Sequence, residues 1–261
     1  MRSHLSAPIA TLMVTDVATV AAADPLSEVE AVFERRGCSS APVMENGKMI
    51  GVVSRTDLLR AGRRDAAGHG GALAPLTSKK AGEMATRPAI TVGPRESVSQ
   101  VAAKMVERRI HRVFVEDEQG LLGVFSTLDL LTAIGAARIA TPLTEVMSKP
   151  AFTVPVAASI AHATDRLAAA HVSGVVVVDD EGWPVGIFSQ REALLSHALS
   201  AETSVEEAMN HGLVCLHSKA PLFRAANLAA AARARRVLVI EDRRVIGVIT
   251  PLDFARAVAT P

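Results

Sequence analysis

Apolar and polar positions follow one order along the chain, and this order recurs four times. Each unit contains a short β-like run, an amphipathic helical segment, two further β-like runs joined by a polar turn, and a second helical segment. The helical period is clearest at 96–109, where one face carries Val98, Val101, Ala102, Met105 and Val106. The pattern therefore predicts four β-α-β-β-α units, each preceded by a short helical turn.

The β-like runs are short and contain many β-branched residues, which favour strands. The first run of each unit lies at 17–20, 89–92, 151–154 and 213–216. The second run lies at 40–44, 112–116, 174–178 and 236–240. Only a few turn-forming residues separate the second run from the third, so we expect these two runs to form a hairpin in every unit.

One motif stands at the third β-like run of every unit: Gly, two apolar residues, Ser or Thr, two variable residues and an acid. Its copies begin at Gly51, Gly123, Gly186 and Gly247, at intervals of 72, 63 and 61 residues. A series of methionines keeps step with the glycines, at Met13, Met84, Met147 and Met209. The chain is therefore a tandem repeat of about 60 residues with an insertion in the first interval.

The repeats and the insertion define the predicted domain organisation. The repeats span 8–62, 80–138, 141–200 and 202–260, with a linker at 63–79 that is rich in Gly, Ala and charge. A unit of this size with a three-stranded sheet cannot easily bury both faces of the sheet alone. We therefore predict an α/β (α+β) protein in which four repeats form two pairs.

The Ser/Thr-x-x-acid part of the motif has two interpretations that the sequence leaves open. In the first, it is a capping box at the start of a helix. Glu or Gln is the usual acid of a capping box, whereas Asp stands in three of the four copies here. In the second, the carboxylate accepts hydrogen bonds from the two hydroxyls of a ribose, and cations elsewhere bind the phosphates of the same nucleoside ligand.

Basic residues stand in register at the second β-like run of repeats two and four. They are His111 and Arg112 in repeat two, and Arg235 and Arg236 in repeat four. Arg112 and Arg236 each precede the motif glycine of their repeat by 11 residues. The matching residues of repeats one and three are small: Ser39, Ser40, Ser173 and Gly174. Two basic pairs in register beside the acid motifs predict anion binding by the even-numbered repeats.

Composition narrows the classes of function. The formal net charge is +1, aromatic residues make up 3%, and there is no Tyr, which disfavours nucleic-acid binding. The longest charge-free run, 150–164, is too short to cross a bilayer, and the N-terminus lacks the apolar run of a signal peptide. We find no P-loop, nucleophile elbow or metal-ligand spacing. We therefore expect a cytoplasmic protein that is not an enzyme and binds neither nucleic acid nor membrane.

In these repeats and motifs, the sequence resembles the cystathionine-β-synthase (CBS) domain family. The motif resembles the GhhSxxDhh pattern of that family, and HRVFV at 111–115 resembles the His-Arg element of the gamma subunit of AMP-activated protein kinase. The resemblance covers residues 8–259. It implies that the repeats pair through their sheets into two Bateman modules, whose clefts bind AMP, ADP, ATP, S-adenosylmethionine or NAD.

The resemblance also implies roles for individual residues. The acids that hold the ribose are Asp57, Asp129 and Asp253, and their hydroxyl partners are Ser54, Ser126 and Thr250. The first-strand threonines beside the base are Thr19, Thr91 and Thr153. The residues that bind phosphate are His111, Arg112, Arg235 and Arg236. Two positions depart from the family pattern, Glu192 in repeat three and Cys215 in repeat four. We expect two or three usable sites, with repeats one and two as the better module.

The favoured hypothesis is a non-catalytic regulatory module that senses energy state. It binds AMP, ADP or ATP, with or without Mg²⁺, in clefts between paired repeats, and signals to an unidentified partner protein by conformational change; no covalent cofactor is expected. The alternatives are a structural scaffold without ligand and a sensor of S-adenosylmethionine or NAD. The sequence leaves open whether the chain is a monomeric disc or a homodimer.

Overall fold

The computed structural model describes residues 4–65 and 79–259. Most of the predicted linker, 63–79, lies outside the described residues. Within them, the predicted order β-α-β-β-α is present in every repeat, so the predicted fold class is confirmed.

The elements of the odd-numbered repeats are as follows. Repeat one contains β1 (Val20–Ala21), α1 (Leu26–Arg36), β2 (Ser40–Glu45), β3 (Lys48–Ser54) and α2 (Arg55–Asp65). Repeat three contains β7 (Thr153–Pro155), α7 (Ile160–Ala169), β8 (Gly174–Val178), β9 (Pro184–Ser189) and α8 (Gln190–Leu195). Short helical turns lie at α3 (Ala81–Met84), η2 (Ser196–Ala198) and η3 (Val205–Glu207).

The even-numbered repeats follow the same order. Repeat two contains β4 (Thr91–Val92), α4 (Val98–Arg108), β5 (Arg112–Asp117), β6 (Gly120–Ser126) and α5 (Thr127–Ala137). Repeat four contains β10 (Cys215–His217), α9 (Leu222–Ala231), β11 (Val237–Glu241), β12 (Arg244–Ile249) and α10 (Pro251–Val258). Short helical turns lie at η1 (Ile9–Thr11) and α6 (Leu143–Val146).

Each described repeat builds one three-stranded sheet. The first strand is parallel to the second, because a helix connects them, and the third is antiparallel to the second, because a tight turn connects them. In repeat one the turn is Asn46–Gly47, and both residues have positive φ (50° and 75°), as a two-residue hairpin turn requires. The first strands are two or three residues long, shorter than all four predicted runs, because only those residues pair with the second strand.

The repeats form two compact units, which confirms the prediction of two pairs. Unit 1 consists of residues 4–17, 90–151 and 212–259, so it holds repeats two and four. Unit 2 consists of residues 18–65, 79–89 and 152–211, so it holds repeats one and three. The partners within a compact unit are thus alternate repeats, and not repeats one and two, the module that the resemblance implied.

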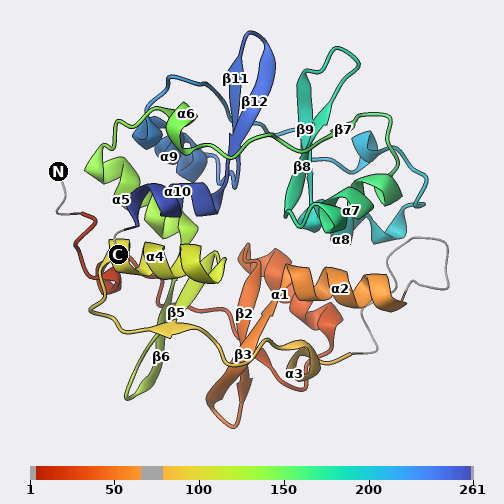
Figure 1. The fold of residues 1–261 in the computed structure, drawn as a ribbon. Helices are drawn as coiled ribbons and strands as arrows, with labels where there is room; N and C mark the ends of the chain where they lie inside the picture. Colours follow the sequence, from red (N-terminus) through yellow and green to blue (C-terminus); the bar gives the residue numbers. More distant parts are fainter. Residues whose placement is uncertain (1–3, 66–78, 260–261) are drawn as a thin grey trace. The chain divides into compact units, whose positions relative to one another are not determined.

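Helices hold each unit together (Figure 1). In unit 1, α5 packs along α9, and α10 packs on α4 and α5. The shared core of this unit includes Phe125 of repeat two and Phe254 of repeat four, both almost fully buried. In unit 2, α2 packs on α8 around a core that includes Phe33 and Phe188. Burying an aromatic side chain of this size contributes about 1.5–3 kcal/mol to folding.

Short segments pass from one repeat to another and join the motif strands. Residues 8–17 belong to repeat one in the sequence, yet Val14 pairs with Val124 of repeat two in unit 1. In unit 2, Thr86 pairs with Val52 in the same way. The corresponding bridges of the other two repeats are Ser148–Val248 and Asn210–Ile187. The boundaries of the repeats in the sequence therefore differ from those of the compact units.

The crossing segments explain why a methionine keeps step with the motif glycines of repeats two, three and four; at Gly51 the nearest atoms of the crossing segment belong to Thr86, Arg87 and Ala85. A Cβ atom on Gly123 would come within 2.8 Å of both the Met13 sulfur and the Val14 carbonyl oxygen. A Cβ on Gly247 would come within 2.6 Å of the Met147 sulfur. Each of these glycines also stands beside an irregularity in the strand pairing, where glycine is common. Only a residue without a side chain lets the crossing segment lie against the strand.

In the part of the chain that the structure describes, no helix combines the length and the apolar character needed to cross a membrane.

Candidate anion-binding site

All four motif acids cap their own helices. In each repeat the acid accepts hydrogen bonds from the backbone N–H and the hydroxyl of the Ser or Thr three residues before it. The pairs are Ser54–Asp57, Ser126–Asp129, Ser189–Glu192 and Thr250–Asp253. The capping interpretation of the motif is therefore correct. A capping carboxylate uses mainly one oxygen, so its surroundings decide whether the other can accept from a ligand.

Three of the motif acids are buried and also contact an arginine. Asp253 is 1% exposed, and its Oδ1 accepts from Ser148 Oγ at 2.7 Å and from Arg256 Nη1 at 2.8 Å. Asp57 is 5% exposed with an arginine nitrogen at 3.5 Å, and Glu192 is 7% exposed with the same separation. These acids already interact through both of their oxygens, so a ribose would have to displace protein contacts to bind there.

Asp129 has different surroundings. Its side chain is partly exposed, and the two hydrogen bonds from Ser126, at 2.7 and 2.8 Å, both end on Oδ2. Thr132 stands three residues after it, where Asp57 and Asp253 are each followed by an arginine. Burial raises the pKa of Asp129 overall, although the Ser126 hydrogen bonds and the positive charge of Arg112 act in the opposite direction. Of the motif acids, Asp129 is the one best placed to accept from a ligand.

The four predicted phosphate residues meet within unit 1 and form what we name the basic cluster: His111, Arg112, Arg235 and Arg236. Burial, together with the charges of Arg235, Arg236 and Arg112, lowers the pKa of His111 from 6.5 to about 4. More than 120 residues separate the two halves of the cluster in the sequence, so the contacts between repeats two and four bring them together.

The geometry of His111 shows which species the basic cluster favours. Its Nδ1 is buried and has no hydrogen-bond partner. Each charged group that acts on the ring is an arginine. The imidazole is therefore neutral at pH 7, and an anion nearby would stabilise its protonated form. Three arginine charges thus surround a neutral, buried ring.

The remaining predicted residues are divided between the units. Thr91 opens β4 in unit 1 and pairs with Phe114 on β5, the strand that begins at Arg112. Thr250 lies in the same unit, but its hydroxyl donates to Asp253, an acid whose two oxygens both have protein partners. Four others lie in unit 2, apart from the basic cluster: Ser54, Asp57, Thr19 and Thr153. The structure thus brings together Asp129, Ser126, Thr91 and the basic cluster within one unit.

Comparison with known families agrees with the repeat structure. The model of the CBS domain matches residues 9–64, 81–136, 143–196 and 205–260.

The chain belongs to the CBS domain family.

Two of the curated relatives that this chain matches are longer proteins. The A-adding tRNA nucleotidyltransferase of Aquifex aeolicus is 28% identical over 114 residues, which is 44% of this chain and 14% of that protein. The gamma-3 subunit of 5′-AMP-activated protein kinase from Sus scrofa is 31% identical over 126 residues, which is 46% of this chain and 23% of that protein. The matches therefore span less than a quarter of either relative.

A solved structure shows the same CBS fold over almost the whole chain. Protein MJ1225 of Methanocaldococcus jannaschii, proposed to be an archaeal homologue of the AMP-activated kinase gamma subunit, superposes with a TM-score of 0.82. The superposition covers 97% of this chain and 100% of MJ1225, at 14% identity. At that identity the similarity concerns the fold.

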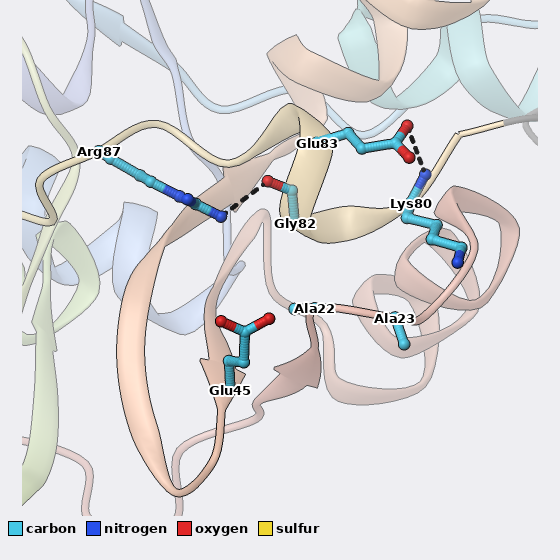
Figure 2. Close-up of a pocket in the computed structure, with 7 residues that line it drawn as sticks. All are labelled: Ala22, Ala23, Glu45, Lys80, Gly82, Glu83 and Arg87. Atoms are coloured by element: carbon cyan, nitrogen blue, oxygen red, sulfur yellow. Dashed lines mark hydrogen bonds between the residues drawn. The ribbon is translucent and has the colours of Figure 1, made fainter.

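One hollow in unit 2 is unrelated to the predicted CBS site residues. It has a volume of about 290 Å³ and is lined by Ala22, Ala23, Glu45, Lys80, Gly82, Glu83 and Arg87 (Figure 2). Arg87 donates to the Gly82 carbonyl at 3.0 Å, and the Lys80 N–H donates to the Glu83 carboxylate at 3.4 Å.

Sequence reasoning missed a second charged group, which we name the unit 2 ion network: Arg55, Glu34 and Arg191. Arg55 and Arg191 occupy the variable positions of the motif, and Glu34 lies near the end of α1. A charge at a variable position or on the polar face of a helix resembles any solvated charge, so the sequence carries no signal of the network. An alignment of the repeats would have pointed only to Ser39 and Ser173, which stand at the positions of His111 and Arg235.

Proposed function

We propose that this chain is a non-catalytic regulatory CBS protein that binds an adenosine nucleotide at unit 1. The phosphates lie on the basic cluster, and the ribose diol donates to Asp129. The observation that carries the proposal is the convergence of His111, Arg112, Arg235 and Arg236, from two repeats, in one unit with the most accessible motif acid.

The chemistry of the two groups supports a nucleotide. Arginines bind phosphate oxygens with short, charge-assisted hydrogen bonds, and a carboxylate oxygen accepts from vicinal hydroxyls. Arg112 acts on both His111 and Asp129, so it connects the phosphate end of the site to the ribose end. A ligand that carries a ribose and phosphates uses both ends. The similarity to a kinase subunit whose name includes activation by 5′-AMP makes AMP the first probe.

The regulatory part of the proposal follows from where the cations originate. Two belong to repeat two and two to repeat four, and α5 and α9 pack these repeats together. A nucleotide that contacts both pairs favours one packing of these helices over others. A partner protein that recognises this packing then responds to the nucleotide.

Isothermal titration of the full chain with AMP, ADP, ATP and S-adenosylmethionine tests the proposal. The double variant Arg112→Gln/Arg236→Gln removes one cation from each repeat. Its matched control, Arg224→Gln/Arg244→Gln, removes two exposed arginines of the same unit outside the cluster. We expect the first variant to bind at least tenfold more weakly, because each lost charged hydrogen bond contributes about 1.5–3 kcal/mol, and the control to bind like the wild type. An absence of heat and of thermal stabilisation with all four ligands at millimolar concentration would refute the proposal.

The four capping acids favour the alternative of a scaffold without ligand. Titrations that test the contact with the ribose separate this alternative from the proposal. Asp129→Asn should weaken AMP by about 1–3 kcal/mol and remove the preference for AMP over 2′-deoxy-AMP. Asp253→Asn, in a closed acid of the same unit, should lower the melting temperature without changing affinity. The scaffold alternative predicts lower melting temperatures for both variants and no ligand effect in either.

A further inference from the structure

The unit 2 ion network joins repeat one to repeat three through one carboxylate. The Nη1 of Arg55 lies 2.7 Å from Glu34 Oε1, and the Nη2 of Arg191 lies 2.7 Å from Glu34 Oε2. Arg55 is 7% exposed and also donates from Nη2 to the Cys38 carbonyl at 3.0 Å. Glu34 and Arg55 come from repeat one, and Arg191 comes from repeat three. Two guanidinium groups from different repeats therefore converge on one carboxylate.

Backbone hydrogen bonds show that the network occupies the place in unit 2 that the basic cluster occupies in unit 1. The N–H of Arg55, the first residue of α2, donates to the Ser39 carbonyl at 3.0 Å. The N–H of Thr127, the first residue of α5, donates in the same way to the His111 carbonyl at 3.1 Å. Gln190, the first residue of α8, repeats the pattern with Ser173 at 3.2 Å.

The cations of the two units reach this place from different elements. In unit 1 they stand beside the start of the middle strands, at His111, Arg112, Arg235 and Arg236. In unit 2 that column holds small residues, and the cations come from the first turn of the following helices, at Arg55 and Arg191. Both units thus present arginines from two repeats at the same end of their sheets.

The carboxylate of Glu34 behaves as an anion bound to these arginines. Burial raises its pKa, but the contacts with Arg55 and Arg191 outweigh this effect and lower the pKa below its ordinary value. The group is therefore ionised at neutral pH. An ionised carboxylate between two guanidinium groups uses the same charge-assisted contacts that arginines make with phosphate oxygens.

We propose that Glu34 is a built-in anion that fills a latent phosphate site formed by Arg55 and Arg191, and so restricts phosphate binding to unit 1. The restriction to unit 1 rests on the proposed function; the latent site in unit 2 does not. Replacing Glu34 by Gln keeps the shape of the side chain and removes its charge. Arg55 and Arg191 then remain at the same end of the sheet, and an oxyanion from solution can neutralise them.

Equilibrium dialysis of the full chain against inorganic phosphate tests the proposal. Glu34→Gln should bind one phosphate more per chain than the wild type. The matched control Glu34→Gln/Arg191→Gln removes one of the two arginines and should lose the additional phosphate. Equal phosphate counts for the wild type and Glu34→Gln would overturn the proposal. The count of the wild type reports on unit 1, so failure of the proposed function and failure of this inference give different results.

A thermal measurement covers the case in which Glu34→Gln is too unstable to dialyse. Removing the charge of Glu34 leaves the buried Arg55 without its counter-ion, so this variant should melt below the wild type in chloride. Phosphate at equal ionic strength should raise its melting temperature, or its refolding yield, more than it does for the wild type and for the double variant. General stabilisation by phosphate acts on all three proteins alike. Equal stabilisation of the three, or failure of Glu34→Gln to fold in either salt, would show that Glu34 has only a structural role.

Discussion

The pKa of His111 reflects the burial of its ring and the charges around it. Burial and three arginines all disfavour its protonated form, and together they lower its pKa from 6.5 to about 4. The folded protein therefore keeps this imidazole neutral at pH values where the unfolded chain protonates it. Asp129, on the next helix of the same repeat, shifts in the opposite direction, because burial raises its pKa. Both pKa shifts favour the neutral form of the group over the charged form. A ligand that carries a phosphate and hydroxyls would stabilise the charged forms of both groups.

The free energy of unfolding should decrease as the pH decreases, because of His111. Below pH 6.5 the imidazole is protonated in the unfolded state, whereas in the folded state it is protonated only near pH 4. Unfolding therefore becomes more favourable as the pH decreases from 6.5 to about 4. The loss reaches about 3 kcal/mol for this group near pH 4. Urea unfolding of the wild type and of His111→Gln at pH 7 and pH 4.5 measures it. The wild type should lose more unfolding free energy than the variant; equal losses would contradict the shifted pKa.

At the scale of elements, the motif joins a strand, a helix start and a segment from another repeat. The Ser or Thr and the acid begin the helix, and the glycine admits the crossing segment. Every part of the motif therefore has a structural role in all four repeats. This explains why the motif persists at Glu192, where the pattern of the ribose acid is broken but the capping box remains.

The close approach at Gly123 predicts a sharp difference between two glycines of unit 1. Gly123→Ala places a methyl group against the Met13 sulfur and the Val14 backbone, and should cost about 1–3 kcal/mol of stability through overpacking. Gly93→Ala meets no atom within 4 Å and should be neutral or slightly stabilising. Chemical denaturation of both variants measures the difference. Similar stabilities would show that the crossing segment does not lie against Gly123.

At the scale of the whole molecule, two units with the same fold carry different charge arrangements. Unit 1 combines the even-numbered repeats and gathers the basic cluster, whereas unit 2 combines the odd-numbered repeats and pairs its arginines with Glu34. The alternation of basic and small residues along the sequence thus becomes a division between units. On the proposed function, unit 1 binds the nucleotide phosphates and unit 2 does not.

Hydrogen exchange with and without AMP tests this division. Bound nucleotide should slow exchange at 111–129 and 235–253, because ordering of the site suppresses local opening there. The matching segments of unit 2, 39–57 and 173–192, should change much less. Mass spectrometry of peptides from these ranges gives the comparison in a single sample. Equal protection of both units would contradict the assignment of the phosphates to unit 1.

Local signals predicted most of the fold. Short apolar runs, a 3.6-residue period in 96–109 and turn residues such as Asn46–Gly47 specify strands, helices and hairpins from neighbouring residues alone. The residues of the basic cluster could be predicted because they hold matching positions in repeats two and four, and matching positions of a repeat lie at matching places in its fold. The sequence left the role of the acids open, since a capping Asp and a ribose-binding Asp have the same neighbours in the chain.

The sequence by itself thus determined the four repeats, their elements and the residues that alternate between them. The tertiary structure decided which repeats share a unit, which motif acids are closed by arginines, and that Glu34 meets Arg55 and Arg191. The four repeats have similar apolar faces, so burial alone does not distinguish one pairing from another. Long-range fit between helices does: on α5, a side chain at Gly135 would collide with Asn227 of α9. Such contacts join residues about 90 positions apart and leave no periodic trace in the chain.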